Sequence, residues 1–269
     1  MKLNSRIFIL IIVIVLLIPS YIFSAEAQEN VPVYKFGIDA ACPPWTWVEK
    51  GEVLGFDREV MDFICQEEGF KVEWTDIPWS TIISATSRGK IDILGGGLSF
   101  TFERAKVIDY ARVHFKIGTH ALARKDSTLT AENVFTNGNK IASQAGSTEY
   151  QWVQEELKDK GADIELVGYE SWDDAISDLE SGRVQAVVMN QPQAVAYAEK
   201  RDVKIVAEDL FLDLIAYAVT PGDPYNLIPK LERGIKKAYD TGLWAKLVEK
   251  YMPWSEIEEV PYPADLQQK

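Results

Sequence analysis

Alternation between strand and helix patterns limits the possible folds of this chain more than any other feature. Segments 34–38, 71–75 and 90–94 are short and apolar, as strands are, and segments 57–68 and 80–89 carry apolar residues at helical spacing. Strands that are connected through helices pair in parallel. The first block therefore predicts a mainly parallel sheet flanked by helices, which is an α/β fold.

A second block repeats the pattern of the first. In each, a tryptophan is followed by isoleucine after four positions, glycine after ten, and then a basic and a β-branched residue, beginning at Trp79 and Trp172. Both glycines, Gly89 and Gly182, suit the left-handed position just beyond a helix. We interpret the chain as two lobes of one architecture. The second block predicts strands at 140–143, 164–167, 184–189 and 203–207 and helices at 148–157, 172–180 and 193–200.

The chain visits the first lobe twice. A strand at 118–124 leaves it near His120, and the extended segment 211–219 returns to it near Ala216. Two crossings predict a hinge and a cleft between the lobes. The expected domains are 28–120 (lobe 1, first part), 121–215 (lobe 2) and 216–269 (return to lobe 1). The other elements expected are an apolar segment at 107–110 and C-terminal helices at 226–239 and 243–251.

The N-terminus has the pattern of a secretory signal peptide. Lys2 and Arg6 precede an apolar run at 7–18, and small residues end at Ala27. We expect cleavage after Ala27, so that 1–27 are removed and the protein is secreted across the inner membrane as a soluble periplasmic protein. Extension of the run through 21–23 leaves open an uncleaved membrane anchor.

Composition excludes some classes of function. The net charge of -13 argues against a nucleic-acid partner. Only two histidines are present, without paired metal-ligand spacing, so we expect neither a metal site nor a cofactor. An exported chain with Cys42 and Cys65 could form one disulfide, and the sequence leaves that question open.

The segment 92–104 has the features of an anion-binding site. Three glycines follow a strand, and Ser99 and Thr101 are placed to cap a helix that carries Arg104. Bare backbone amides, a helix start and an arginine fork can together bind a carboxylate. The alternative is a glycine-rich connection beside a solvated Arg104.

The ordered motifs resemble a known family. They are Gly37-Ile-Asp39, Pro43-Pro44-Trp45, Gly55-Phe-Asp57, Trp79, the segment 92–104, Gly146-Ser-Thr148 and the segment 182–190. This order is similar to that of the polar amino-acid solute-binding proteins of bacterial ABC importers (solute-binding protein family 3). The resemblance implies a two-lobed periplasmic-binding-protein fold of type II. It also implies a monomer that captures a small carboxylate-bearing solute, an amino acid or a derivative, and delivers it to a membrane permease.

The resemblance also assigns roles to residues. Arg104 matches the arginine that grips the ligand's carboxylate, Gly97 and Ser99 match polar contributors of the first lobe, and Ser147 and Thr148 match those of the second. Trp79 matches a wall of the side-chain pocket, and Asp39 a contact to the ligand's distal end. The implied ligand-binding residues are Asp39, Cys42, Trp79, Gly97, Ser99, Arg104, Gln144, Ser147, Thr148 and Asn190.

Two of these positions depart from the family pattern. Cys42 stands where an aromatic residue commonly stacks on the ligand, and Asn190 stands where an aspartate usually pairs with its ammonium. Either another acid, Asp39 or Glu149, takes the ammonium, or the ligand lacks an ordinary α-ammonium. Two structural interpretations accompany these roles. Trp45 is a hydrophobic plug behind the Pro-Pro turn more readily than a ligand contact, and Asp57 is a helix cap.

Two other classes of function remain as alternatives to a binding protein. The scaffold also carries an exported dehydratase, but no catalytic serine, histidine and acid set is visible here, so we do not expect an enzyme. A membrane-anchored ligand sensor would require the N-terminal segment to be retained. The sequence identifies neither the solute nor the permease.

Overall fold

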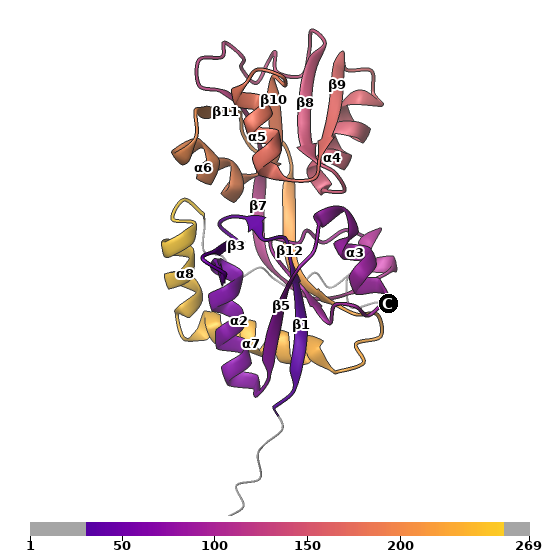
Figure 1. Cartoon of the computed structure of the whole chain (residues 1–269), viewed down its shortest axis with the longest axis vertical. Coiled ribbons are helices and arrows are strands. Elements are labelled where there is room, and N and C mark those ends of the chain that lie inside the picture. Colours follow the sequence, from indigo (N-terminus) through magenta and orange to yellow (C-terminus); the bar gives the residue numbers. More distant parts are fainter. Residues whose placement is uncertain (1–30, 256–269) are drawn as a thin grey trace, which may run out of the picture. The chain divides into compact units, whose positions relative to one another are not determined.

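The computed structural model describes residues 31–255, whose main sheet contains nine strands (Figure 1). The order is β5-β1-β6-β12-β7-β10-β8-β9, with β11 paired to β7. The predicted signal peptide, 1–27, lies outside the described residues. Within residues 31–255 no helix combines the length and apolar character needed to cross a bilayer. The nine-stranded sheet and its helices confirm the α/β class expected from the sequence.

The first lobe surrounds a parallel core of three strands. β1 (Val33–Ile38) pairs in parallel with β5 (Lys71–Asp76) and with β6 (Ile93–Leu94). α2 (Phe56–Glu68) buries Val60, Met61 and Ile64 and ends where Gly69 adopts a left-handed conformation. The remaining helices of this lobe are α3 (Trp79–Ser87), α7 (Leu227–Asp240) and α8 (Leu243–Tyr251).

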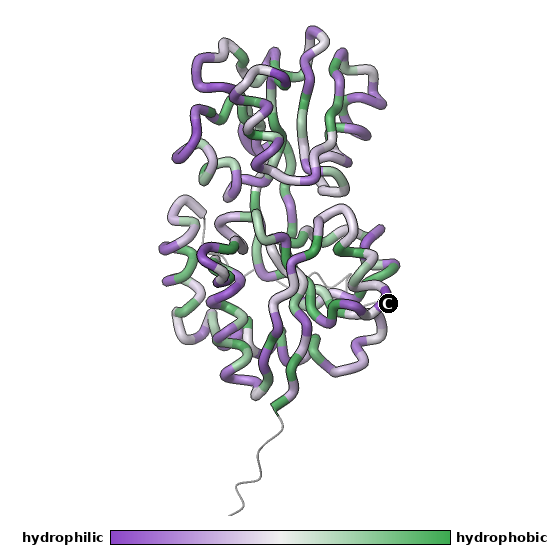
Figure 2. Tube along the Cα trace, viewed as in Figure 1, coloured by the Kyte–Doolittle hydropathy of each residue, from purple (hydrophilic) through white to green (hydrophobic). Residues whose placement is uncertain are grey.

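The second lobe repeats this arrangement. β8 (Asn139–Gln144) pairs in parallel with β9 (Ile164–Tyr169) and β10 (Ala186–Asn190), and β11 (Val203–Ala207) adds to β7. Hydrophobic segments follow the strands, whereas hydrophilic segments gather in the outer helices and loops (Figure 2). The helices are α4 (Thr148–Trp152), continued by the π-helical η2 (Val153–Lys158), α5 (Trp172–Glu180) and α6 (Gln191–Lys200).

One long strand, β7 (Asp109–Arg124), joins the lobes (Figure 1). Through Gly118 it pairs with β12 (Leu212–Val219), and from Thr119 onward it pairs with β10 and β11. The prediction of a short segment at 107–110 and a separate strand at 118–124 was wrong. The strand continues through Gly118 because it pairs with β12 up to this residue and with β10 from the next one, and the missing side chain leaves room for the Asp209 carboxylate.

Some local predictions were also wrong. A small antiparallel sheet of β2 (Ala41–Cys42), β3 (Thr46–Glu49) and β4 (Glu52–Leu54) was not foreseen. The helix expected to carry Arg104 is only a single 3-10 turn, η1 (Arg104–Lys106). Its N-cap is Glu103. The Thr101 hydroxyl accepts a hydrogen bond from the Arg104 amide, whereas Ser99 lies in a bridge with Ile215.

Gly97 lies where the glycine turn after β6 touches Trp45. Its φ is +73°, and a Cβ there would lie 2.6 Å from the Trp45 indole. Gly51 has a similar φ of +83°, but nothing lies within 4 Å of its Cβ position. Both positions therefore require glycine for backbone reasons, and only Gly97 requires it for space.

We predict that Gly97→Ala destabilises the protein more than Gly51→Ala does. The left-handed backbone should cost about 1 to 2 kcal/mol at each site. The contact with Trp45 should add about 1 to 3 kcal/mol at Gly97 alone. Urea denaturation of both variants measures the difference, and equal losses would show that the turn can move away from Trp45.

Candidate functional site

Strand ends bring the predicted site residues together. Asp39 follows β1, Ser99 follows β6, Gln144 ends β8 and Asn190 ends β10. Carboxyl ends of strands in an open α/β sheet are the usual location of a ligand site. Of the ten predicted residues, Arg104 and Thr148 are partly exposed and the other eight are buried.

Arg104 donates to main-chain carbonyls of both lobes. Its Nη1 lies 2.9 Å from the Ser99 oxygen, and its Nη2 lies 3.0 Å from the Gly146 oxygen. The guanidinium carbon lies 5.6 Å from the Trp79 ring centroid, within the range of a cation–π interaction. Two carbonyls and an aromatic face thus fix the orientation of this cation at the junction of the lobes.

Asp213 is a buried acid of the site that the sequence analysis missed. Its Oδ2 accepts hydrogen bonds from the Ser99 hydroxyl at 2.6 Å and from the Thr148 hydroxyl at 2.8 Å. The two hydroxyl oxygens lie 3.1 Å apart. We call Arg104, Ser99, Thr148 and Asp213 the Arg104 network. Asp213 could have been found, because it is the one acid on the buried face of β12, which otherwise presents Ile215, Tyr217 and Val219.

Glu149 places a second acid beside this network. Its Oε2 lies 3.3 Å from the Thr148 hydroxyl, and only 3% of the residue is exposed. Burial, followed by the negative charge of Asp213, raises the pKa of Glu149 to about 7. Burial also raises the pKa of Asp213, while hydrogen bonds from Ser99 and Thr148 and the charge of Arg104 act in the opposite direction. The site is therefore rich in carboxyl groups.

Ser147, in contrast, serves the helix that begins beside it. It is the N-cap of α4, and its hydroxyl accepts a hydrogen bond of 3.0 Å from the Tyr150 amide. A second contact of 3.4 Å joins the hydroxyl to that of Ser143. The hydroxyl of Ser147 therefore serves the start of α4, and it also contributes a hydrogen bond that lowers the pKa of Glu149.

A second network connects Asp39 with the other lobe. The Gln144 side-chain nitrogen donates to Asp39 Oδ2 at 2.8 Å and to the Glu170 carbonyl at 3.0 Å. The Ala41 amide donates to Asp39 Oδ1. Burial raises the pKa of Asp39 above its ordinary value, and the bond from Gln144 opposes that shift. A buried carboxylate on which an amide donor converges is suited to a polar or cationic ligand group.

Asn190 and Cys42 are joined through Gln193. Asn190 is the N-cap of α6: its Oδ1 accepts from the Gln193 amide at 3.2 Å, and its Nδ2 donates to Gln193 Oε1 at 2.5 Å. Gln193 Nε2 in turn lies 3.0 Å from Cys42 Sγ. Both cysteines are free thiols, Cys42 buried and Cys65 partly buried, so the disulfide left open by the sequence is not formed.

The prediction that Asp57 caps α2 was wrong. Gly55 is the N-cap, and the Asp57 carboxylate instead accepts from the Gly96 amide at 2.6 Å and from the Tyr217 hydroxyl at 2.8 Å. Burial raises its pKa to about 6, while these hydrogen bonds lower it. Asp57 thus fixes the glycine turn from the core side. The prediction missed this because its partners, Gly96 and Tyr217, are distant in sequence.

Trp45 packs as a plug beneath the same turn. It is fully buried, and its ring makes edge-on contacts with Phe56 at 5.8 Å and Phe115 at 5.6 Å between centroids. The close approach of Gly97 completes this packing. Trp45 therefore supports the turn from the core side.

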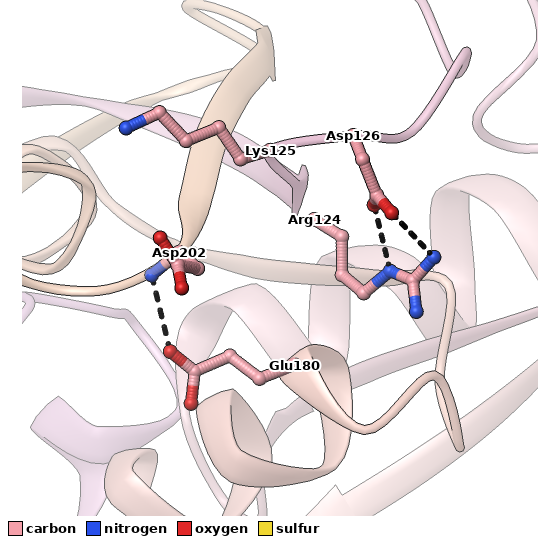
Figure 3. Close-up of a pocket in the computed structure, with 5 residues that line it drawn as sticks. All are labelled: Arg124, Lys125, Asp126, Glu180 and Asp202. Atoms are coloured by element: carbon pink, nitrogen blue, oxygen red, sulfur yellow. Dashed lines mark hydrogen bonds and ion pairs between the residues drawn. The ribbon is translucent and has the colours of Figure 1, made fainter.

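A cavity of about 530 Å³ lies elsewhere on the second lobe (Figure 3). Arg124 pairs with Asp126 at 3.0 Å, and the Glu180 carboxylate accepts a hydrogen bond from the main-chain amide of Asp202 at 3.1 Å. Exposed ion pairs such as Arg124–Asp126 contribute little free energy. The converging strand ends are the stronger candidate site.

Comparisons with known proteins identify similar chains. The profile of "Bacterial extracellular solute-binding proteins, family 3" matches residues 34–253. "ABC transporter arginine-binding protein 1" of Escherichia coli (strain K12) is 24% identical over 253 residues, 90% of this chain and 98% of that protein.

Two solved structures are similar in fold and sequence. "An ancestral arginine-binding protein bound to arginine" is 30% identical with a TM-score of 0.74, covering 82% of this chain and 98% of that one. "Crystal structure of the ancestral amino acid-binding protein AncCDT-1, a precursor of cyclohexadienyl dehydratase" is also 30% identical with a TM-score of 0.74, covering 81% and 95%.

We predict that the folded protein becomes less stable between about pH 4 and about pH 7. Glu149 and Asp57 have pKa values raised to about 7 and about 6 from ordinary values of 4.5 and 3.8. The folded state therefore binds more protons than the unfolded state in this range. The corresponding stability is complete below the ordinary values and is lost as pH rises through the raised ones.

Glu149→Gln should flatten this decline, because glutamine stays neutral throughout. Exposed Glu208→Gln makes the same change of charge and should keep the wild-type profile. Chemical denaturation at several pH values measures both variants. A Glu149→Gln profile as steep as that of wild type would mean that Glu149 titrates normally.

Proposed function

Because the chain belongs to family 3 of the bacterial extracellular solute-binding proteins, we propose that it captures an amino acid with a cationic side chain for ABC-type import. The observation that carries this proposal is the composition of the strand-end cluster. Its buried acids are Asp39, Glu149 and Asp213, and its cation is Arg104. An amino acid with two cationic groups and one carboxylate brings the complementary charge.

The names of the relatives support the same ligand class. The E. coli relative and the ancestral protein solved with arginine are both named as arginine-binding. A neutral zwitterionic amino acid would pair its carboxylate with Arg104 and its ammonium with one acid, and would leave two buried carboxyl groups without a cation, whereas a cationic amino acid leaves one. Protonation of Glu149, whose pKa is raised to about 7, accounts for one of these groups, so a neutral ligand would still leave one carboxylate without a cation.

The geometry supports a division of the site into two ends. Arg104, with its fork fixed by Ser99 and Gly146, is the group proposed for the ligand's carboxylate, and Trp79 forms the adjacent wall. Asp39, held by Gln144, is proposed for the distal cation. Gly97, in the glycine turn, and Cys42, whose thiol donates to the Gly96 carbonyl, are proposed to lie between these two ends.

The same proposal includes place and motion. We propose that lobes with the boundaries 28–120, 121–215 and 216–269 move about the crossings in β7 and β12. We further propose that cleavage after Ala27 releases a periplasmic monomer, which delivers its ligand to a membrane permease. The intact mass of the exported protein tests the cleavage, since a chain retaining 1–27 would instead fit the anchored sensor.

One observation favours an enzyme as a second candidate. Glu149 is buried, and its pKa of about 7 would suit a proton donor, while one structural neighbour is the precursor of a dehydratase. Against this, Asn190 provides no acid, and the remaining carboxyl groups already accept hydrogen bonds. We therefore propose a binding protein without catalysis, and turnover of prephenate or arogenate by the purified protein would contradict it.

We predict that Arg104→Ala weakens binding of L-arginine by about two to four decades, because an ion pair enclosed in a site contributes about 2 to 5 kcal/mol on truncation. Arg183→Ala, which removes an exposed arginine, should bind like wild type. Isothermal titration calorimetry measures both. Wild-type affinity in Arg104→Ala would exclude the carboxylate role, and a wild-type protein that binds no amino acid would exclude the proposed function.

A further prediction concerns closure. Saturating L-arginine should reduce the radius of gyration measured by solution X-ray scattering, because a ligand bound by both lobes favours the conformation in which they approach each other. Arg104→Ala at the same ligand concentration serves as the control and should retain the radius of the free protein. A radius unchanged by ligand in the wild type would argue against a hinge.

A further inference from the structure

We propose that Asp213 is the acid that binds the ligand's α-ammonium group, a role that Asn190 does not fill. This inference rests on the proposed function and names the subsite within it. Asp213 projects from the inner face of β12, is 5% exposed and belongs to the Arg104 network. Its position, its hydrogen-bond partners and the state of Asn190 each contribute to the argument.

The position of Asp213 relative to Arg104 matches the layout of an α-amino acid. The guanidinium holds the carbonyl oxygen of Ser99, and Asp213 holds the hydroxyl of the same residue. Arg104, which suits a carboxylate, and Asp213, which suits a cation, therefore both contact Ser99. An α-amino acid carries its carboxylate and its ammonium on a single carbon, so one such carbon can present both groups here.

The hydroxyls of Ser99 and Thr148 determine what this subsite can accept. Each hydroxyl has a single proton. The short contacts of 2.6 and 2.8 Å show that both hydroxyls donate this proton in a hydrogen bond to the Asp213 carboxylate. Neither proton is then free for the carboxylate of a ligand. What remains is one carboxylate and the lone pairs of two hydroxyls, a set of acceptors that suits an ammonium with its three donors.

Glu149 increases the demand for a cation at this point. It lies 3.3 Å from the Thr148 hydroxyl, and two buried carboxylates near each other repel when both are ionised. A cation that enters beside Asp213 relieves this repulsion. Without such a cation, Glu149 can be protonated instead. Its carboxyl group can then donate a hydrogen bond to the Thr148 hydroxyl oxygen.

Asn190 has little capacity left for an ammonium. Its Oδ1 accepts from the Gln193 amide, and its Nδ2 donates to the Gln193 side chain. Gln193 continues the chain of contacts to Cys42. Asn190, at the end of β10, thus serves as the cap of α6. The acid that contacts Ser99, which Arg104 also binds, is Asp213 of β12.

Three probes test the assignment. L-Arginine carries all the groups, agmatine lacks the carboxylate, and 5-guanidinopentanoate lacks the α-ammonium. Both analogues are smaller than arginine, so neither adds a clash. Asp213→Asn keeps the shape and an oxygen acceptor for the two hydroxyls while removing the charge. Affinities are measured by calorimetry, with competition against L-arginine for weak binders.

We expect wild type to prefer L-arginine over 5-guanidinopentanoate by about tenfold or more, and Asp213→Asn to lose this preference, because hydrogen bonds to charged groups contribute about 1.5 to 3 kcal/mol. The affinity of Asp213→Asn for agmatine should fall together with its affinity for L-arginine. Asp39→Asn is the matched control. It should weaken all three probes alike, since each retains the distal guanidinium.

Other results would overturn the assignment. Tighter binding of L-arginine by Asp213→Asn would mean that Asp213 competes with the ligand's carboxylate for Ser99 and Thr148. Equal weakening of L-arginine and 5-guanidinopentanoate would mean a structural role. Wild-type affinities for both probes, with the preference retained, would place the ammonium elsewhere. If wild type binds L-arginine but Asp213→Asn behaves in any of these ways, only the assignment fails. If wild type binds none of the probes, the proposed ligand class fails, and the assignment fails with it.

Discussion

Backbone pairing along β7 holds this protein together. One uninterrupted strand, Asp109–Arg124, pairs with β12 over its first part and with β10 and β11 over its last part. Around Ala121 and Leu122 the strand has neighbours on both sides, β10 and β11, and near Gly118 its pairing passes from β12 to β10. The separate cores of the two lobes are therefore connected through main-chain hydrogen bonds, and the site forms where the strand ends of both lobes approach β7 and β12.

That arrangement brings buried charge to the junction. Asp39, Glu149 and Asp213 all lose water there, and burial raises the pKa of each. A folded protein tolerates buried acids when donors or cations compensate for the lost water. Here Gln144, two hydroxyls and Arg104 do so in part. The remaining deficit of positive charge is the physical basis for expecting a cationic ligand.

The glycine turn after β6 depends on a second layer of residues. Asp57 accepts from the Gly96 amide, and Trp45 lies against Gly97, so the turn is fixed from the core side. Rigid support of this kind positions contact groups without itself touching a ligand. Asp57 and Trp45 thus support the proposed site indirectly, through the turn that they hold.

The sequence by itself determined the α/β class and most of the helices and parallel strands, because periodicity and turn chemistry are local properties of a chain. Helix Trp172–Glu180 was predicted with the bounds observed, and the motif around Arg104 marked one end of the proposed site. The tertiary structure alone decided the continuity of β7, the contact of Asp57 with the glycine turn and the place of Asp213. Asp57 meets Gly96 across 39 positions, and Asp213 meets Ser99 across 114. Which acid meets which donor over such separations depends on strand order and register, and no local pattern encodes these.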